Sequence, residues 1–264
     1  MGRSSQKVAA FALMALLAGC GQAPGTATRP ILTDNALDAI PLAPVAAQPG
    51  QQAGPGQTEG IKMLQGLRTA YQRCTGFDSE IKSYSQGNFK AGQHVDELRK
   101  ATTQAKLLWF KPNKTRAEVV TTSNPLLVGA ALVTTNGVDV TARAKGLLSI
   151  FPFHFQASDA KLSNNRNHKF TENNPKSIIE RLTAATAVWT VVGDAVVEGT
   201  PVKMVQVDHI HYLDKEITRE VVGIDPATSA IRRLVMYNGT TKVIDHSFLK
   251  FSWNPHPNSD TFVL

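Results

Sequence analysis

Hydrophobic positions at the start of the folded part of the chain lie three and four residues apart. They are Ile61, Leu64, Leu67, Tyr71 and Cys74. This spacing places them on one face of a helix, so we predict an amphipathic helix over residues 59–75. Thr58 is a suitable N-cap with Glu59 in the first turn, and Gly76 is a natural stop.

From Phe77 onward the hydrophobic period is close to two, which predicts β-strands. The expected strands cover residues 77–84, 102–111, 114–122, 126–135, 138–142, 188–197, 202–212, 216–224, 230–237 and 242–253. The residues between 85 and 92 are expected to form a loop. A second helix is expected over Pro175–Ala185, because Asn174 can cap it and Pro175 suits its first turn.

The connections between the expected strands are short and rich in turn residues. Asn136-Gly137, which lies between two β-rich runs, is the strongest short-range signal for a hairpin. Short connections make sequential strands pair antiparallel. We therefore predict an α+β fold in which a large antiparallel sheet carries two or three helices on one face.

The N-terminus has the features of a lipoprotein signal peptide. Arg3 and Lys7 precede ten unbroken apolar residues, Val8 to Leu17, a run too short to cross a bilayer. The run leads into Leu-Ala-Gly-Cys ending at Cys20, the lipobox of bacterial lipoproteins. We predict that residues 1–19 are removed and that Cys20 is lipidated, which would anchor the chain stably if two or more acyl chains are attached.

A tether is expected between the lipidated cysteine and the folded domain. Residues 20–58 are dense in Ala, Pro, Gly, Gln and Thr, with no aromatic residue and no periodic apolar face. The folded domain is then 59–264. No later apolar run approaches the roughly 20 residues of a spanning helix, so the lipid alone would hold the chain to the extracytoplasmic face of the cell envelope. Gly21 after the cysteine favours the outer membrane, if the cell has one.

Composition and charge restrict the kinds of protein and partner that this sequence allows. Hydrophobic residues make up 42% of the chain, as in a globular protein. The net charge is +7, and removal of Arg3 and Lys7 leaves 26 basic residues against 21 acidic ones, a net charge of +5. The basic residues are scattered and form no nucleic-acid motif, so we expect attraction to anionic lipid and no nucleic-acid partner. Once Cys20 carries lipid, Cys74 has no partner for an internal disulfide, and a buried thiol is expected there.

One run of the sequence resembles a known family. Residues 107–118 read Leu-Leu-Trp-Phe-Lys-Pro-Asn-Lys-Thr-Arg-Ala-Glu, a hydrophobic strand that ends in basic-Pro-Asn and returns through an Arg-containing strand. A leading helix precedes it, the Asn136-Gly137 hairpin follows, and the chain closes with Asn254-Pro255, Asp260 and Phe262. This order resembles the LolA-like lipoprotein-carrier superfamily over residues 59–264. Val138-Asp139-Val140 departs from the aromatic usual after the hairpin.

The resemblance implies an incompletely closed antiparallel half-barrel whose helices cover its concave side, with a cavity that takes acyl chains. Leu107, Trp109 and Lys111 share one face of the expected strand and are candidates for the cavity lining. The hydrophobic segment around Pro152 is a candidate for a lid over the cavity or for an edge that inserts into the membrane. Its residues proposed for the site are Leu147, Leu148, Phe151 and Phe153. Ordinary core packing is the alternative for each of these residues.

The function predicted from the sequence is that of a lipid-anchored, non-enzymatic envelope protein that binds the acyl chains of a lipid or lipoprotein for carriage or acceptance. The alternative is a sensor domain on the same fold that recognises a protein partner. We expect a monomer with no cofactor. His209 and His211 share a strand face but lack a third ligand, so no metal site is expected. Asp245-His246 point to opposite faces, and no catalytic motif is present.

Overall fold

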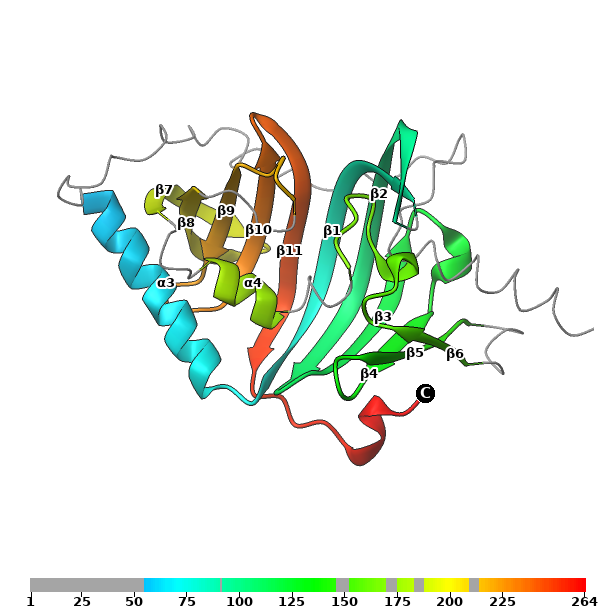
Figure 1. Cartoon of the computed structure of the whole chain (residues 1–264). Coiled ribbons are helices and arrows are strands. Elements are labelled where there is room, and N and C mark those ends of the chain that lie inside the picture. Colours follow the sequence, from blue (N-terminus) through cyan, green and yellow to red (C-terminus); the bar gives the residue numbers. More distant parts are fainter. Residues whose placement is uncertain (1–54, 91, 146–151, 170–174, 183–187, 209–213) are drawn as a thin grey trace, which may run out of the picture. The chain divides into compact units, whose positions relative to one another are not determined.

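The computed structural model describes residues 55–90, 92–145, 152–169, 175–182, 188–208 and 214–264 (Figure 1). Eleven strands form one antiparallel sheet in the order β6-β5-β4-β3-β2-β1-β11-β10-β9-β8-β7. Because β6 and β7 each have a neighbour on one side only, the sheet is not closed. The predicted fold class, a large antiparallel sheet with helices, is confirmed.

The strands and helices have the following bounds. The strands are β1 (Gly76–Lys90), β2 (Gln93–Phe110), β3 (Lys114–Thr122), β4 (Ala131–Thr134), β5 (Asp139–Arg143), β6 (Phe153–Gln156), β7 (Val188–Val197), β8 (Thr200–Asp208), β9 (Arg219–Ile224), β10 (Ile231–Asn238) and β11 (Thr241–Trp253). The α-helices are α3 (Pro55–Arg73) and α4 (Pro175–Leu182), and the 3-10 helices are η1 (Pro125–Leu127), η3 (Ala160–Leu162) and η4 (Ser259–Phe262). No helix in these described residues is both long and apolar enough to cross a membrane.

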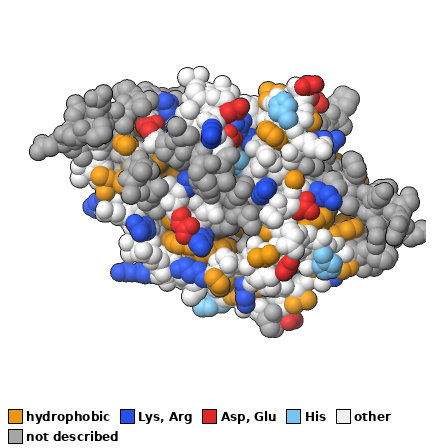
Figure 2. Space-filling view, viewed as in Figure 1, with side chains coloured by type: hydrophobic (Ala, Val, Ile, Leu, Met, Phe, Trp, Pro, Cys, Tyr) orange, Lys and Arg blue, Asp and Glu red, His pale blue; other side chains and the backbone are white. Residues whose placement is uncertain are grey.

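The chain divides into two compact units, which we describe separately. Within the described residues, the first combines 74–178 and 248–264, and the second combines 55–73 and 179–247. Strand β11 starts in the second unit and ends in the first. On the face shown in Figure 2, basic and acidic side chains are interspersed with scattered hydrophobic ones, in keeping with the scattered charges of the sequence.

The first unit is built on a hairpin much longer than the sequence predicted. We expected a strand over 77–84, a loop over 85–92 and no further strand before 102, whereas β1 and β2 pair without a break from Gly76↔Phe110 to Gly87↔Arg99. The alternation of apolar and polar residues that marks a strand is missing at the far end of this hairpin, because both of its faces carry polar residues there. The polar residues on one of these faces, Ser85 and Arg99, are buried all the same.

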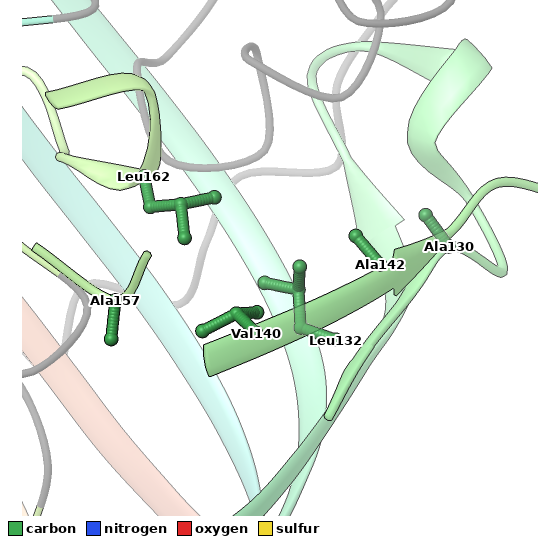
Figure 3. Packing of buried hydrophobic residues seen from close by; sticks show 6 residues of the cluster. All are labelled: Ala130, Leu132, Val140, Ala142, Ala157 and Leu162. Atoms are coloured by element: carbon green, nitrogen blue, oxygen red, sulfur yellow. The ribbon is translucent and has the colours of Figure 1, made fainter. Parts of the chain in front are cut away.

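A buried cluster fills the part of this unit formed by β4, β5 and β6 (Figure 3). Its members are Ala130, Leu132, Val140, Ala142, Ala157 and Leu162, with Ala117, Phe153 and Phe155 packed against them. Leu162 comes from η3, so a segment outside the sheet covers this face. The Asn136-Gly137 hairpin is confirmed: it joins β4 to β5, with Gly137 in the left-handed region at φ 77°. The strand expected over 126–135 is shorter, because 125–127 form η1.

In the second unit, α3 lies against the edge strand β7. Gly56 and Gly60 are one helical turn apart, and a Cβ on Gly60 would lie 3.1 Å from the carbonyl of Trp189 in β7. Without side chains at these positions the helix can approach the strand backbone closely, which protects the sheet edge from pairing with another chain. Helix α3 begins at Pro55, four residues before the predicted start, because Pro fits the first turn of a helix.

Helix α4 is held to β9 of this unit by a buried ion pair. Arg181 donates to Glu220 through Nε–Oε1 at 2.7 Å and Nη2–Oε2 at 2.9 Å. The two side chains are 4% and 0% exposed. The indole N–H of Trp189 donates to the carbonyl of Leu182 at 2.8 Å, which fixes the end of the helix. The predicted helix over 175–185 is confirmed as far as Leu182.

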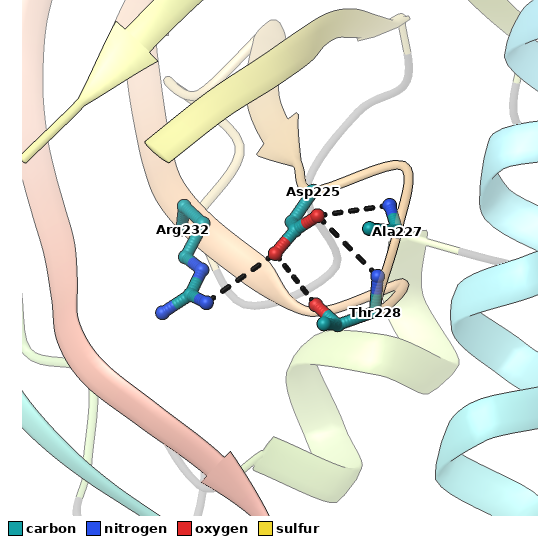
Figure 4. Close-up of polar contacts among 4 residues, drawn as sticks. All are labelled: Asp225, Ala227, Thr228 and Arg232. Carbon is teal, nitrogen blue, oxygen red and sulfur yellow. Dashed lines mark hydrogen bonds and ion pairs between the residues drawn. The ribbon is translucent and has the colours of Figure 1, made fainter. Parts of the chain in front are cut away.

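One carboxylate organises the turn between β9 and β10 (Figure 4). Asp225 accepts hydrogen bonds from the N–H groups of Ala227 and Thr228 and from the Thr228 hydroxyl, and Arg232 lies 3.3 Å away. Burial tends to raise the pKa of Asp225, but these hydrogen bonds outweigh burial and hold it below its usual value.

The first prediction concerns the ion pair under α4. Arg181→Met leaves the Glu220 carboxylate buried without its partner, so we expect a loss of about 3–5 kcal/mol in the free energy of unfolding. The double variant Arg181→Met, Glu220→Leu removes both charges and should recover much of that loss. Urea unfolding followed by circular dichroism measures both values. A double variant as unstable as the single one would contradict this account.

Candidate functional site

Directly opposed residues of β1 to β6 form one row across the first unit. The row is Ser79, Leu107, Ala117, Leu132, Ala142 and Phe153. Directly opposed residues lie on the same face of a sheet. Two residues predicted for the site, Leu107 and Phe153, therefore share a face with Trp109, which follows Leu107 by two positions on β2. We call it the Trp109 face.

Where it crosses β1, β2 and β3, the Trp109 face combines apolar side chains with uncharged polar ones, such as Ser79 and Thr103, and it is incompletely covered. Its β2 positions are Ala101, Thr103, Ala105 and Leu107, and its neighbours include Ile81 of β1 and Ala117 of β3. All six are half-buried, in contrast to the fully buried cluster on β4 and β5. We call these six residues the Ala105 strip. Most of their side chains are small.

An aromatic cluster closes one end of the Ala105 strip. Trp109 is 1% exposed, and its ring centroid lies 5.9 Å from that of Phe77, its cross-strand partner. Phe77 stacks on Phe251 of β11 at 5.1 Å, and Trp253 lies edge-on to Phe251 at 4.7 Å. Large aromatic side chains exclude water efficiently. This end of the face is therefore dry and filled.

The loop Ala157–Lys169 covers the opposite end of the strip. The Asn165 side-chain N–H2 donates to the backbone oxygens of Ser85 and Arg99, each at 3.0 Å. The N–H of Phe89 donates to the Asn165 carbonyl at 3.1 Å. A Cβ on Gly87 would lie 2.1 Å from that carbonyl oxygen, so only glycine permits the loop to lie this close. Asn165 thus bridges β1 and β2 where their register shifts, between Gly87 and Phe89.

The other face of β1 and β2 is polar. Glu80, Lys106 and Glu118 are directly opposed across β1, β2 and β3, so charges of opposite sign alternate. The hydrogen bond from Gln104, helped by Lys250 at 3.3 Å, holds the pKa of Glu80 below its usual value. This face therefore suits contact with water, whereas the Trp109 face does not.

The polar side of β2 is covered at the end of the strand. The C-terminal segment lies against this side there: the ring centroids of Phe110 and Phe262 are 5.9 Å apart, and Arg116 donates to the Thr261 carbonyl at 2.9 Å. The coverage is local, because residues on this side further from the end, such as Lys100, Gln104 and Lys106, are half-buried or exposed.

No family model matches the chain, and no curated protein matches it. Similar solved structures include LprF from Mycobacterium bovis, with 12% identity, a TM-score of 0.46 and coverage of 78% of this chain and 97% of that one. Lipoprotein LppX from Mycobacterium tuberculosis has 10% identity, a TM-score of 0.45 and coverage of 77% and 99%. A LolA superfamily protein from Nitrosomonas europaea has 6% identity, a TM-score of 0.36 and coverage of 78% and 97%.

The open antiparallel sheet with its helices matches the architecture that the sequence resemblance implied. The function is therefore inferred from the residues of this chain.

The other predicted site residues that the structure describes, Lys111 and Phe153, lie outside the Ala105 strip. Strand β2 ends at Phe110, so Lys111 does not continue its face; the Lys111 N–H donates to the carbonyl of Thr75 at 2.9 Å. Burial raises the pKa of the neighbouring Cys74 thiol, against the opposing charge of Lys111. Phe153 lies in the edge strand β6 and packs on the buried cluster, which favours its core alternative over a lid.

Several predicted residues lie outside the part of the chain that the structure describes. They are Cys20, Leu147, Leu148, Phe151, His209 and His211. Within the described residues, no group of three or more His, Cys, Asp or Glu side chains could hold a metal ion. Asp245 pairs with Arg233 at 2.8 Å. Burial tends to raise the pKa of Asp245, but Arg233 and Lys242 outweigh burial and lower it.

Sequence reasoning missed the residues at the loop-covered end, namely Gly87, Arg99 and Asn165. The sequence could have indicated Arg99, because it precedes Trp109 on β2 by an even number of residues and therefore lies on the same face of the strand. Asn165 left no such signal, since its partners lie 66 and 80 residues away in the sequence.

The second prediction concerns the docking of this loop. Gly87→Ala forces a Cβ against the Asn165 carbonyl, so we expect a stability loss of about 1–3 kcal/mol and faster amide exchange at Phe89. The control is Gly199→Ala, where nothing lies within 4 Å and only the left-handed φ of +80° opposes a side chain. It should lose about 1 kcal/mol and leave Phe89 exchange unchanged. Equal exchange in both variants would contradict the docking described.

Proposed function

We propose that this protein is a lipid-anchored, non-enzymatic protein of the bacterial cell envelope that binds the acyl chains of a lipid or lipoprotein on its Trp109 face, for carriage or acceptance. The observation that carries the proposal is the Ala105 strip, whose side chains are half-buried, mostly small and, apart from Thr103, apolar. A filled core would not leave these residues partly accessible. An acyl chain would complete the burial of this surface.

The energetics suit reversible binding. Removal of apolar surface from water contributes about 25 cal/mol per Å². A chain that buries on the order of 300 Å² would gain roughly 7 kcal/mol before the costs of association, which permits both capture and release. The absence of charged side chains among the six strip residues removes the desolvation cost that a charge would add.

The N-terminus supports the location in this proposal. The charged start, the ten-residue apolar run and the lipobox ending at Cys20 would deliver a lipid-modified chain to the extracytoplasmic side of a membrane, with the outer membrane favoured. The excess of basic residues fits an anionic lipid surface. A membrane, through the anchor, and an acyl-chain ligand are thus the proposed partners of a monomeric protein.

The third prediction tests the binding face. Leu107→Glu places a carboxylate among apolar neighbours, which costs several kcal/mol unless it protonates, so affinity for a fatty acid or phospholipid should fall by about tenfold or more. The matched control is Leu98→Glu on the same strand, where the side chain is 53% exposed on the opposite face. It should bind like the unmodified chain. Calorimetry is the suitable readout, because Trp109 is already buried and its emission would change little.

The outcomes separate the proposal from its alternative. Circular dichroism must first show that both variants are folded. Saturable binding lost only in Leu107→Glu supports the proposal. Failure of the unmodified full-length protein to bind any acyl-chain ligand would reject it and favour a sensor domain that recognises a protein partner.

The fourth prediction tests the anchor. Serine cannot form the thioether to diacylglycerol, so Cys20→Ser should accumulate as an unprocessed or soluble chain. Membrane fractionation and the mass of the N-terminal peptide measure this. The lipobox interpretation is wrong if the Cys20→Ser chain is cleaved and remains in the membrane fraction like the unmodified protein.

A further inference from the structure

The Trp109 face changes from apolar to polar along strand β2. Read at every second position, β2 presents Trp109, Leu107, Ala105, Thr103, Ala101 and Arg99 on this face. The aromatic end is dry, the middle is the Ala105 strip, and the last position is a guanidinium. A ligand with an apolar tail and a polar head would match this order in one orientation only.

The polar end is buried, although it carries positive charge. Arg99 is 7% exposed, His168 is 2% exposed and Asn165 is 0% exposed. The covering loop Ala157–Lys169 adds Arg166 and Lys169, which are half-buried. Its single carboxylate, Asp159, accepts a hydrogen bond from the N–H of Lys161 and caps η3. The chemistry concentrated here is that of an anion site.

The first unit as a whole also has a net positive charge. Residues 74–178 and 248–264 hold 15 Lys and Arg against 9 Asp and Glu, whereas residues 55–73 and 179–247 hold 10 of each. The excess positive charge of the folded chain therefore belongs to the unit that carries the Trp109 face. Such a field favours an anionic ligand there.

Asn165 provides an independent sign of a ligand. Its side-chain nitrogen lies 3.0 Å from two backbone oxygens, which only an N–H2 group can satisfy, so the orientation of the amide is fixed. The other amide atom, Oδ1, is then a buried acceptor, and it has no hydrogen-bond partner. Buried acceptors are normally paired, so this atom calls for a donor from outside the chain.

We propose that Arg99, His168 and Asn165 form the subsite for an anionic, hydroxyl-bearing headgroup, such as that of a phosphatidylglycerol. This inference rests on the proposed acyl-chain binding. Arg99 and His168 donate to the phosphate oxygens, and a headgroup hydroxyl donates to Asn165 Oδ1. The acyl chain of the ligand lies along the Ala105 strip toward Trp109. From Ala101 to Leu107 the strand extends about 20 Å, comparable to one acyl chain, since two leaflets make a hydrocarbon core of about 30 Å.

Calorimetry on the full-length protein tests the subsite with three single-chain probes of equal chain length. They are lysophosphatidylglycerol, zwitterionic lysophosphatidylcholine and uncharged monoacylglycerol. We expect the first to bind about tenfold more tightly than the second. Arg99→Gln should abolish that preference and leave monoacylglycerol binding unchanged. Lys100→Gln is the matched control, because it removes the same charge from the next residue, whose side chain is exposed on the other face; it should keep the preference.

Each outcome decides one question. If no probe binds to the unmodified protein, the acyl-chain function fails and the subsite fails with it. If all probes bind equally, or if Arg99→Gln keeps the preference, the chain site stands and the headgroup subsite is rejected.

A labelling experiment on the unmodified protein covers the case in which Arg99→Gln does not fold. A lysophosphatidylglycerol with a photoreactive group at the end of its chain should label peptides that contain Phe77 or Trp109. Labelling of peptides that contain Arg99 or His168 instead would reverse the orientation and overturn the inference.

Discussion

The unbroken register between β1 and β2 is the constraint on which the first unit depends. It runs through twelve residue pairs from Gly76↔Phe110 to Gly87↔Arg99. Because side chains alternate between faces, a slip by one residue would exchange the Trp109 face with the charged one. The row that continues through Ala117, Leu132 and Phe153 requires the same register. Each apolar residue of the candidate site thus owes its place to backbone pairing rather than to local preference.

The register ends where the covering loop begins. Between Gly87 and Phe89 the pairing shifts, and Asn165 supplies hydrogen bonds to strand carbonyls on both sides. Its 0% exposure means that these bonds form away from water, where an unpaired carbonyl would be costly. The loop therefore stabilises the far part of a hairpin whose own side chains provide little apolar contact. Because the aromatic cluster covers one end of the Trp109 face and the loop covers the other, the middle of this face is less covered than either end.

The second unit uses different means to hold its helices. Helix α3 approaches β7 through Gly56 and Gly60, where backbone meets backbone, and α4 is tied to β9 by the buried pair of Arg181 and Glu220. Close packing gives little directional preference, whereas a bidentate ion pair has one geometry. We infer that the pair sets the position of α4 while Ile179 and Leu182 provide its hydrophobic burial.

The sequence by itself determined the elements whose signals are local. The amphipathic spacing of Ile61, Leu64 and Leu67 predicted α3, and period-two alternation with turn residues predicted most strands, because both signals arise from neighbours in the chain. The same alternation placed Leu107 and Trp109 on one face. Only the tertiary structure decided the length of the β1–β2 hairpin, the strand at Phe153 and the contact of Asn165 with the backbone of Ser85 and Arg99. That contact joins buried polar groups 66 and 80 positions apart in the sequence, and no local pattern encodes such a pairing.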